Sequence, residues 1–174
     1  EVKIYNTDQV NNAKELNLRD IFEGNDTAKS ILNDDNHPLW KEIIETVKDY
    51  NPDTVGISIN FTMIAKAGLK IAELIKQWNP IIKVVVGGPH ASIVPNETLS
   101  DKNIDFLVRY EGEDTMLELI QRKDIASIRG LSYKDTDGRI IHNEDRKFIE
   151  NLDEIPFPKL KLQLKKISDP ENNF

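Results

Sequence analysis

Two apolar stretches decide the fold that this sequence predicts: Val-Gly-Ile-Ser-Ile at residues 55–59 and Lys-Val-Val-Val-Gly-Gly at residues 83–88. Both are short and nearly continuous in apolar character, which is typical of strands covered on both faces of a sheet. Between them, apolar residues recur at helical spacing over residues 64–78, and Asn79-Pro80 ends that helix. A strand, a helix and a second strand in this order predict a parallel unit with a right-handed crossover.

The same alternation continues on both sides of this unit. Residues 38–50 predict a helix that begins at Pro38 and is stopped by Asn51-Pro52-Asp53. Further elements are expected downstream: a short helix at 95–101, a strand at 104–108 and a helix around 116–120. The fold class is therefore α/β, a flavodoxin-like (Rossmann-like) doubly wound parallel sheet with helices on both faces.

The pattern changes towards both ends of the chain. Residues 2–5 alternate as a short strand should, and the polar stretch 9–36 predicts a loop with one short helix. Beyond Lys123, two apolar segments flank Asp137-Gly138, which predicts a C-terminal β-hairpin extension. We therefore expect three parts: an α/β domain at 1–125, a hairpin and exit segment at 126–158, and a linker at 159–174.

Composition narrows the classes of function. The 23 basic and 30 acidic residues give a net charge of −7, which would repel nucleic acid. The basic residues are scattered along the sequence, so no basic patch that could bind nucleic acid is expected. No apolar run approaches the roughly 20 residues that span a bilayer, and no signal peptide opens the chain, so we expect a cytoplasmic location. The lack of cysteine excludes disulfides, thiolate zinc sites and iron–sulfur clusters within these 174 residues. Since the chain begins at Glu1, we expect a fragment of a larger protein.

Ligands of a doubly wound sheet bind beyond the carboxyl ends of its strands, and three loops are expected there. The first offers hydroxyl groups and free backbone N–H groups at a helix start. The second has paired glycines, which permit positive φ and close approach of a ligand. The third has carboxylates that can accept hydrogen bonds from ligand hydroxyls or amides. The candidate ligand-binding residues are Ser58, Asn60, Phe61 and Thr62; Gly87, Gly88, Pro89 and His90; and Glu111, Gly112 and Glu113.

Each loop also has a purely structural interpretation. Thr62 can be an N-cap, and Gly87-Gly88 can form a tight strand-to-helix turn. His90 can contact a ligand or a metal, or be merely solvated. Carboxylates at residues 111–114 are favoured by the helix dipole whatever their function. A hydrolase using paired carboxylates has no support beyond Glu111 and Glu113 themselves.

Motifs for self-contained catalysis are absent from the sequence. There is no phosphate-binding loop, no dinucleotide-binding glycine pattern after a strand and no nucleophile elbow. The three histidines, His37, His90 and His142, are not at metal-ligand spacing with one another. We therefore assign no catalytic residue and no metal ligand to this chain.

With these loops in place, the chain resembles the cobalamin-binding domain found at the front of many radical-SAM enzymes. The resemblance covers most of the chain from about Trp40 to Pro158 and depends on an ordered set of motifs. These are Gly56-Ile57-Ser58, Val85-Val86-Gly87-Gly88-Pro89-His90-Ala91, Asp105-Phe106-Leu107, Tyr110-Glu111-Gly112-Glu113 and Asp153-Glu154-Ile155-Pro156-Phe157-Pro158.

A second pattern supports the resemblance. Many cobalamin-binding modules have Ser-x-Leu followed at a set distance by Gly-Gly. Here 26 residues, 61–86, separate Ser58-Ile59-Asn60 from Gly87-Gly88, which is within the spacing of those modules, although Asn60 replaces the leucine. In the family these two segments surround the dimethylbenzimidazole nucleotide tail of the cofactor. A flat, largely apolar tail needs a slot lined by small residues with a few hydroxyls at its rim.

The resemblance implies a module that holds cobalamin for a methyltransferase or cyclase of the radical-SAM type and is not catalytic alone. The histidine loop that ligates cobalt in some relatives, together with a first strand, is expected upstream of Glu1. A 4Fe–4S cluster and S-adenosylmethionine are expected in a radical-SAM domain of the same polypeptide, beyond Pro158. Because a missing first strand leaves strand edges unpaired, we expect either that a preceding segment supplies this strand or that the isolated domain rearranges or forms a homo-oligomer.

Two other functions stay open. A receiver-like signalling module has the same layout, but it requires a phospho-accepting aspartate where Ser58-Ile59-Asn60 stands. A nucleotide- or sugar-binding α/β domain would use the same crevice.

Overall fold

The computed structural model describes residues 26–151, 153 and 155. The strand predicted at residues 2–5, the linker predicted at 159–174 and most of the exit segment at 152–158 lie outside the described residues. Within the described part, one five-stranded sheet has the order β1-β2-β3-β4-β5. The strands are β1 (Thr54–Ser58), β2 (Lys83–Gly87), β3 (Phe106–Val108), β4 (Leu131–Lys134) and β5 (Ile140–His142).

The sheet is parallel in its first half and antiparallel in its second. β1, β2 and β3 are parallel neighbours, as predicted. The predicted hairpin is confirmed, since β4 and β5 pair antiparallel around Gly138, which has a φ of 79°. The hairpin also pairs with β3, which makes the whole sheet mixed. It therefore continues the same sheet.

Helices follow the strands as the periodicity predicts. The helix expected at residues 38–50 has those bounds, and the helix expected at 64–78 begins one residue later. One difference is a separate short helix that begins at Pro89, directly after the Gly-Gly turn, because proline is pre-set for a first helical position. No described helix is both long and apolar enough for a membrane span. The helical elements are α2 (Asp26–Asn33), α3 (Pro38–Tyr50), η3 (Thr62–Ile64), α4 (Ala65–Trp78), α5 (Pro89–Ile93), α6 (Pro95–Ser100), α7 (Glu113–Ile120) and η4 (Ile125–Ser127).

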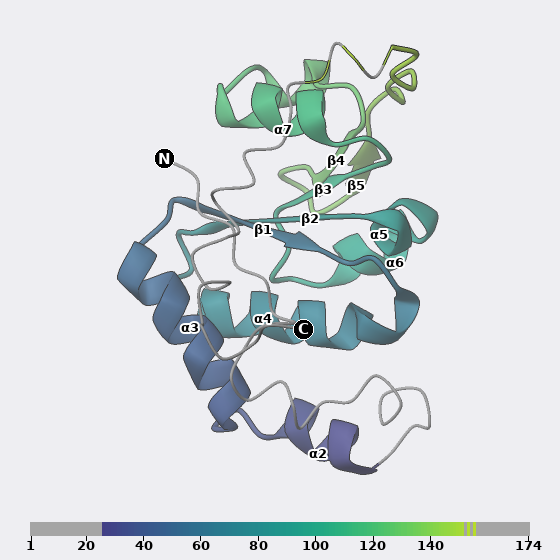
Figure 1. The fold of residues 1–174 in the computed structure, drawn as a ribbon. Coiled ribbons are helices and arrows are strands. Elements are labelled where there is room, and N and C mark those ends of the chain that lie inside the picture. The colour runs from purple at the N-terminus through teal and green to yellow at the C-terminus, as the bar shows by residue number, and fades with distance from the viewer. Residues whose placement is uncertain (1–25, 152, 154, 156–174) are drawn as a thin grey trace.

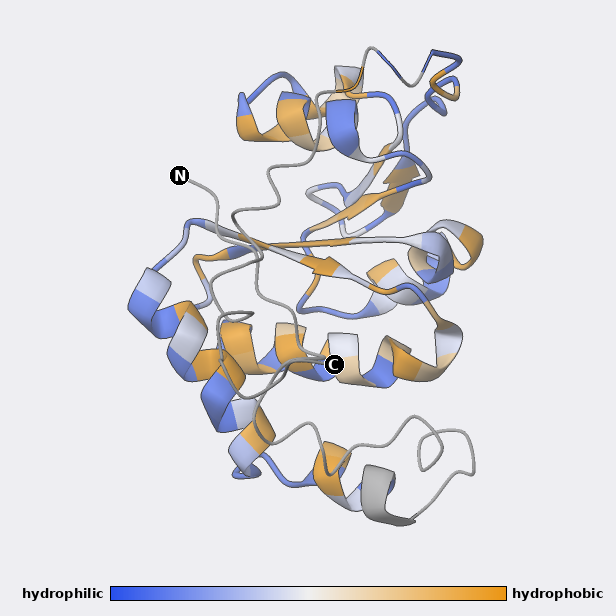
Figure 2. Ribbon diagram, in the orientation of Figure 1, coloured by the Kyte–Doolittle hydropathy of each residue, from blue (hydrophilic) through white to orange (hydrophobic). Residues whose placement is uncertain are grey.

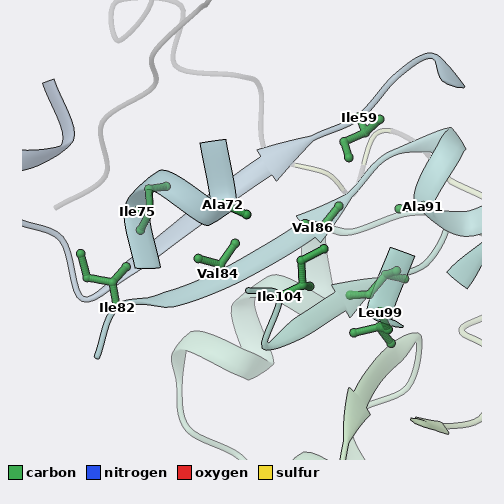
Figure 3. Close-up of a cluster of buried hydrophobic side chains, with 10 residues drawn as sticks. Ile59, Ala72, Ile75, Ile82, Val84, Val86, Ala91, Leu99 and Ile104 are labelled. Atoms are coloured by element: carbon green, nitrogen blue, oxygen red, sulfur yellow. The ribbon is translucent and has the colours of Figure 1, made fainter. Parts of the chain in front are cut away.

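Helices cover both faces of the sheet, with α4 on one side and α7 on the other (Figure 1). Successive residues of β2 point to opposite faces, so Val84 and Val86 pack with α4 residues, whereas Val85 packs in the core under α7. The larger core lies on the α4 side, where Ile75 and Ala72 meet β2 (Figure 3). Figure 2 shows apolar residues along the strands and, among polar residues, on the helices.

Candidate functional site

The carboxyl ends of β1 and β2 place the first two predicted loops side by side. Ser58 and Gly87 are direct partners in the parallel register, and the Ile59 N–H donates to the Gly87 carbonyl at 2.9 Å. The two segments singled out by their spacing in the sequence therefore meet at one edge of the sheet. The prediction that both segments contribute to one site requires them to meet in this way.

Gly88 is needed for the packing of the chain against itself. It has a φ of 97° and a ψ of 173°, a conformation that is essentially restricted to glycine. A Cβ at this position would lie 2.7 Å from the carbonyl oxygen of Ile59. Gly87 differs, because a Cβ there would make only ordinary contacts with Val108, at 3.5 Å and beyond. The tight-turn interpretation therefore holds for Gly88.

A hydrogen bond between side chains joins the first two loops. The Nδ1 of His90 lies 3.1 Å from the hydroxyl oxygen of Thr62, and the His90 N–H donates to the Ile59 carbonyl at 3.2 Å. Thr62 is the first residue of η3, and its N-cap is Phe61, without a side-chain capping bond. The N-cap interpretation of Thr62 is therefore wrong, because its hydroxyl is directed to His90.

The first loop is largely exposed. The Ser58 hydroxyl donates to the side-chain oxygen of Asn60 at 2.9 Å, and both residues are exposed, as is Thr62. The Phe61 side chain is 64% exposed. An exposed aromatic ring among hydroxyl and amide groups gives this loop both an apolar surface and polar groups that a ligand can reach.

The third loop is connected to the second through Ser92. The Ser92 hydroxyl donates to the Gly88 carbonyl at 3.1 Å and accepts from the Tyr110 N–H at 2.7 Å. Tyr110 has a φ of 58° and is 49% exposed. One oxygen of Glu111 accepts from the Ile149 N–H at 2.7 Å, so this carboxylate has a partner within the protein. All three predicted loops thus lie along the same edge.

The third loop ends at the N-terminus of α7, where a glycine is followed by two acidic residues. Gly112 is the N-cap of α7 and makes no side-chain capping bond, and a Cβ there would meet Val108 at 3.2 Å. Glu113 and Asp114 occupy the first turn of α7, as the dipole interpretation expects. Glu113 is exposed at the site edge.

Next to this edge, one face of β1 is left uncovered by the described part of the chain. Val55 and Ile57 pack towards α4, so Gly56 and Ser58 lie on the opposite face, where both are exposed. Gly87 lies on that same face of β2, and the core under α7 includes no residue of β1. No described residue comes within 4 Å of a Cβ built on Gly56. We call Gly56, Ser58 and Gly87 the small-residue bed.

Asp105, part of one of the family-like motifs, lies at the opposite edge of the sheet. Its carboxylate accepts from the Val84 N–H at 2.8 Å and pairs with Lys76 at 2.6 Å and Lys83 at 3.2 Å. Burial raises the pKa of Asp105, but the hydrogen bonds from Lys76 and Val84 outweigh it, so the pKa lies below its ordinary value. Asp105 therefore connects β2, β3 and α4 and takes no part in the site.

Sequence reasoning missed two connecting residues, Ser92 and Arg109. Arg109 is 5% exposed, and its guanidinium donates to Asp145 at 2.7 Å and to the Leu131 carbonyl at 3.2 Å. An arginine directly after a buried apolar strand was the one available signal, because a buried charge requires partners. Ser92 has no comparable signal in the sequence.

Comparison of the sequence with known proteins identifies the family to which this domain belongs. The model of a family described as B12 binding domain matches residues 17–120, more than half of the chain. The chain is 36% identical over 124 residues to the uncharacterized methyltransferase PH0819 of Pyrococcus horikoshii, covering 68% of this chain and 27% of that protein. It is 31% identical over 134 residues to the anaerobic magnesium-protoporphyrin IX monomethyl ester cyclase of Rubrivivax gelatinosus, covering 72% and 23%. The chain thus spans about a quarter of the length of these relatives.

Solved structures show the same fold. The cobalamin-dependent S-adenosylmethionine radical enzyme OxsB, with aqua-cobalamin and S-adenosylmethionine bound, matches with a TM-score of 0.55 at 26% identity. That match covers 62% of this chain and 16% of OxsB. The radical S-adenosylmethionine methyltransferase TsrM from Kitasatospora setae matches with a TM-score of 0.53 at 21% identity, covering 60% of this chain and 21% of TsrM. At that identity the second match is informative about the fold alone.

Proposed function

Since this chain belongs to the family of B12 binding domains, we propose that it holds cobalamin at the carboxyl edge of its sheet, as one module of a larger radical-SAM enzyme. The prediction of a cobalamin-binding domain is confirmed at the level of the family. The receiver-like and nucleotide-binding alternatives gain no support from the comparisons.

The observation that carries the proposed binding mode is the small-residue bed. Because Gly56, Ser58 and Gly87 have little or no side chain, a flat group can lie directly on the backbone of β1 and β2. The bed lies on the α7 side of the sheet, beyond the core under α7, which includes no described residue of β1, and it is adjacent to the loop edge. These residues therefore fit the nucleotide tail of cobalamin, which needs a slot lined by small groups.

The loop residues would provide the polar contacts at the rim of this slot. Ser58 and Thr62 have exposed hydroxyls, and Asn60 has an exposed amide. His90 is half-buried, and its Thr62 contact holds the ring at the edge. We assign the cofactor contacts to the predicted set, namely Ser58, Asn60, Phe61, Thr62, Gly87, Gly88, Pro89, His90, Glu111, Gly112 and Glu113.

The remaining parts of the proposal concern the larger protein. When bound, cobalamin would supply a cobalt ion able to carry a methyl group or an electron, and this chain would supply position and exclusion of water. A radical-SAM domain of the same polypeptide, with its own 4Fe–4S cluster and S-adenosylmethionine, would contain the reaction site. We also propose a cytoplasmic location, no nucleic-acid partner and, where the first strand is missing, a homo-oligomer formed through strand edges. Among the described residues β1 pairs with β2 alone, which supports the last of these.

Retention of hydroxocobalamin tests the proposed function. The chain and the full natural protein in which it occurs are each incubated with hydroxocobalamin, separated by gel filtration and examined for visible absorbance that elutes with protein. The proposal predicts retention at a stoichiometry of about one cobalamin per chain. Absence of retention by the full natural protein overturns it, and retention of nucleotides in a parallel titration would favour the alternative.

A further inference from the structure

The segment that follows β5 runs back along the third loop of the site (yellow-green in Figure 1). We define residues 143–149 as the strap. The Gly130 N–H donates to the Glu144 carbonyl at 2.8 Å, and the Asn143 side chain donates to the Ile125 and Ile128 carbonyls at 2.7 and 2.8 Å. These bonds fix the beginning of the strap beside β4.

Arg109 is the first anchor between the strap and the loop. It directly precedes the site loop, and its guanidinium donates to Asp145 through Nε at 3.0 Å and through Nη2 at 2.7 Å. It also donates to the Asn143 carbonyl and to the Ser132 hydroxyl. Because the guanidinium is buried, each of these contacts is costly to lose. The backbone where the loop leaves β3 is therefore held by strap residues.

Glu111 is the second anchor, two residues further along the loop. Its carboxylate accepts from the strap N–H of Ile149 at 2.7 Å. Between the anchors, the Tyr110 ring meets the Phe148 ring edge-on, with centroids 6.0 Å apart and an interplanar angle of 68°. Tyr110 needs such support, because a non-glycine residue with a φ of 58° is strained on its own.

Arg146 extends the same attachment to α7. Its guanidinium donates to the Thr115 hydroxyl at 3.2 Å and to the Glu118 carboxylate, and it lies 3.6 Å from Asp114. Every third-loop residue assigned to the cofactor thus lies between a strap contact on its β3 side and a strap contact on its α7 side.

We propose that the strap is a positioning element of the cofactor site: it holds the third loop in its binding conformation through Arg109 and Glu111. The inference rests on the proposed function, and it changes the role given to Glu111. That carboxylate acts on the site through Ile149, so it is a positioning residue for the loop.

A double-mutant cycle separates this role from direct contact with the cofactor. Glu111→Ala removes the acceptor, and Ile149→Pro removes the N–H donor without changing the glutamate. One hydrogen bond to a charged group corresponds to roughly tenfold in an equilibrium constant. Each single variant should therefore lower the affinity for hydroxocobalamin about threefold to tenfold, and the double variant should lower it no further.

Glu111→Gln is the matched control. Its side-chain oxygen still accepts from the Ile149 N–H, so affinity should return to near that of the natural chain. Independent effects of the two single variants, or an unchanged affinity in Ile149→Pro, would overturn the proposal and favour direct contact by Glu111. Far-UV circular dichroism at the assay temperature checks that each variant is folded, because a loss of overall stability alone does not change the affinity of the folded fraction.

Hydrogen exchange without cofactor distinguishes failure of the strap from failure of the proposed function. Amides of residues 110–112 should exchange about tenfold faster in both single variants than in the natural chain if the strap orders the loop. Unchanged exchange refutes the strap even if cobalamin binds. Faster exchange in a protein that retains no cobalamin supports the strap's control of the loop and rejects the cofactor assignment.

Discussion

Replacing Gly56 with valine should strengthen the fold and remove the cofactor site. None of residues 26–151, 153 and 155 lies within 4 Å of a Cβ at this position, so the added side chain meets no neighbour among them. Glycine inside a strand costs about 0.5–1 kcal/mol relative to alanine, and valine is among the best strand formers. We expect a stability gain of roughly 0.5–1 kcal/mol, which raises the melting temperature by about 1–4 °C in a domain of this size.

The same side chain would occupy the small-residue bed. Extra methyl groups forced into a close-packed contact cost about 1–3 kcal/mol, which corresponds to a roughly 5- to 150-fold weaker affinity for hydroxocobalamin. Gly56→Ala should have a melting temperature and an affinity between those of the natural chain and those of Gly56→Val. Isothermal titration gives the affinity, and a thermal melt without cofactor gives the stability.

Ile57→Val is the control on the other face of β1. Its side chain packs with the α4 core, so losing one methylene should cost about 0.5–1.5 kcal/mol of stability and leave the affinity unchanged. The reasoning is refuted if Gly56→Val binds hydroxocobalamin as tightly as the natural chain. It is also refuted if Gly56→Val melts at a clearly lower temperature, since the face would then be covered.

Three further outcomes follow from the structure. Gly88→Ala should cost about 1–3 kcal/mol of stability in a denaturant titration without cofactor, because its backbone conformation excludes a side chain; no loss would contradict the tight turn. Asp105→Asn should cost about 1–3 kcal/mol above pH 5 by weakening the contact with Lys76. The folded pKa of Asp105 lies below its ordinary 3.8. The stabilisation by its carboxylate is therefore lost as the pH falls below 3.8 and through the folded pKa. Below the folded pKa, Asp105→Asn and the natural chain should be equally stable. Burial and Arg109 lower the pKa of His142 below its ordinary 6.5, so the unfolded chain binds a proton first and stability should decline as pH falls below 6.5. Urea titrations at about pH 7 and pH 5 should show no such step in His142→Gln.

Much of the site was predictable because its parts are encoded locally. The apolar runs around Val55 and Val84 predict neighbouring buried strands, and parallel connection alone places their carboxyl ends at one edge. Ser58 and Gly87-Gly88 could therefore be placed together without coordinates, and the register pairs Ser58 with Gly87. The residues that connect the loops were not predictable in this way. Ser92 and Arg109 have partners 18 and 36 residues distant in the chain, and no local pattern specifies such partners.

The sequence by itself determined the alternation of strands and helices, the glycines at the strand ends and the family to which the chain is similar, because each depends on residues close together in the chain. Only the tertiary structure decided that the hairpin pairs with β3, that Gly88 allows the close approach of the Ile59 backbone, and that Glu111 accepts a hydrogen bond from the strap. These depend on contacts between distant segments, whose free energy is set by which surfaces meet after folding. The open face at Gly56 belongs to the same group, because exposure is a property of what fails to pack over a residue.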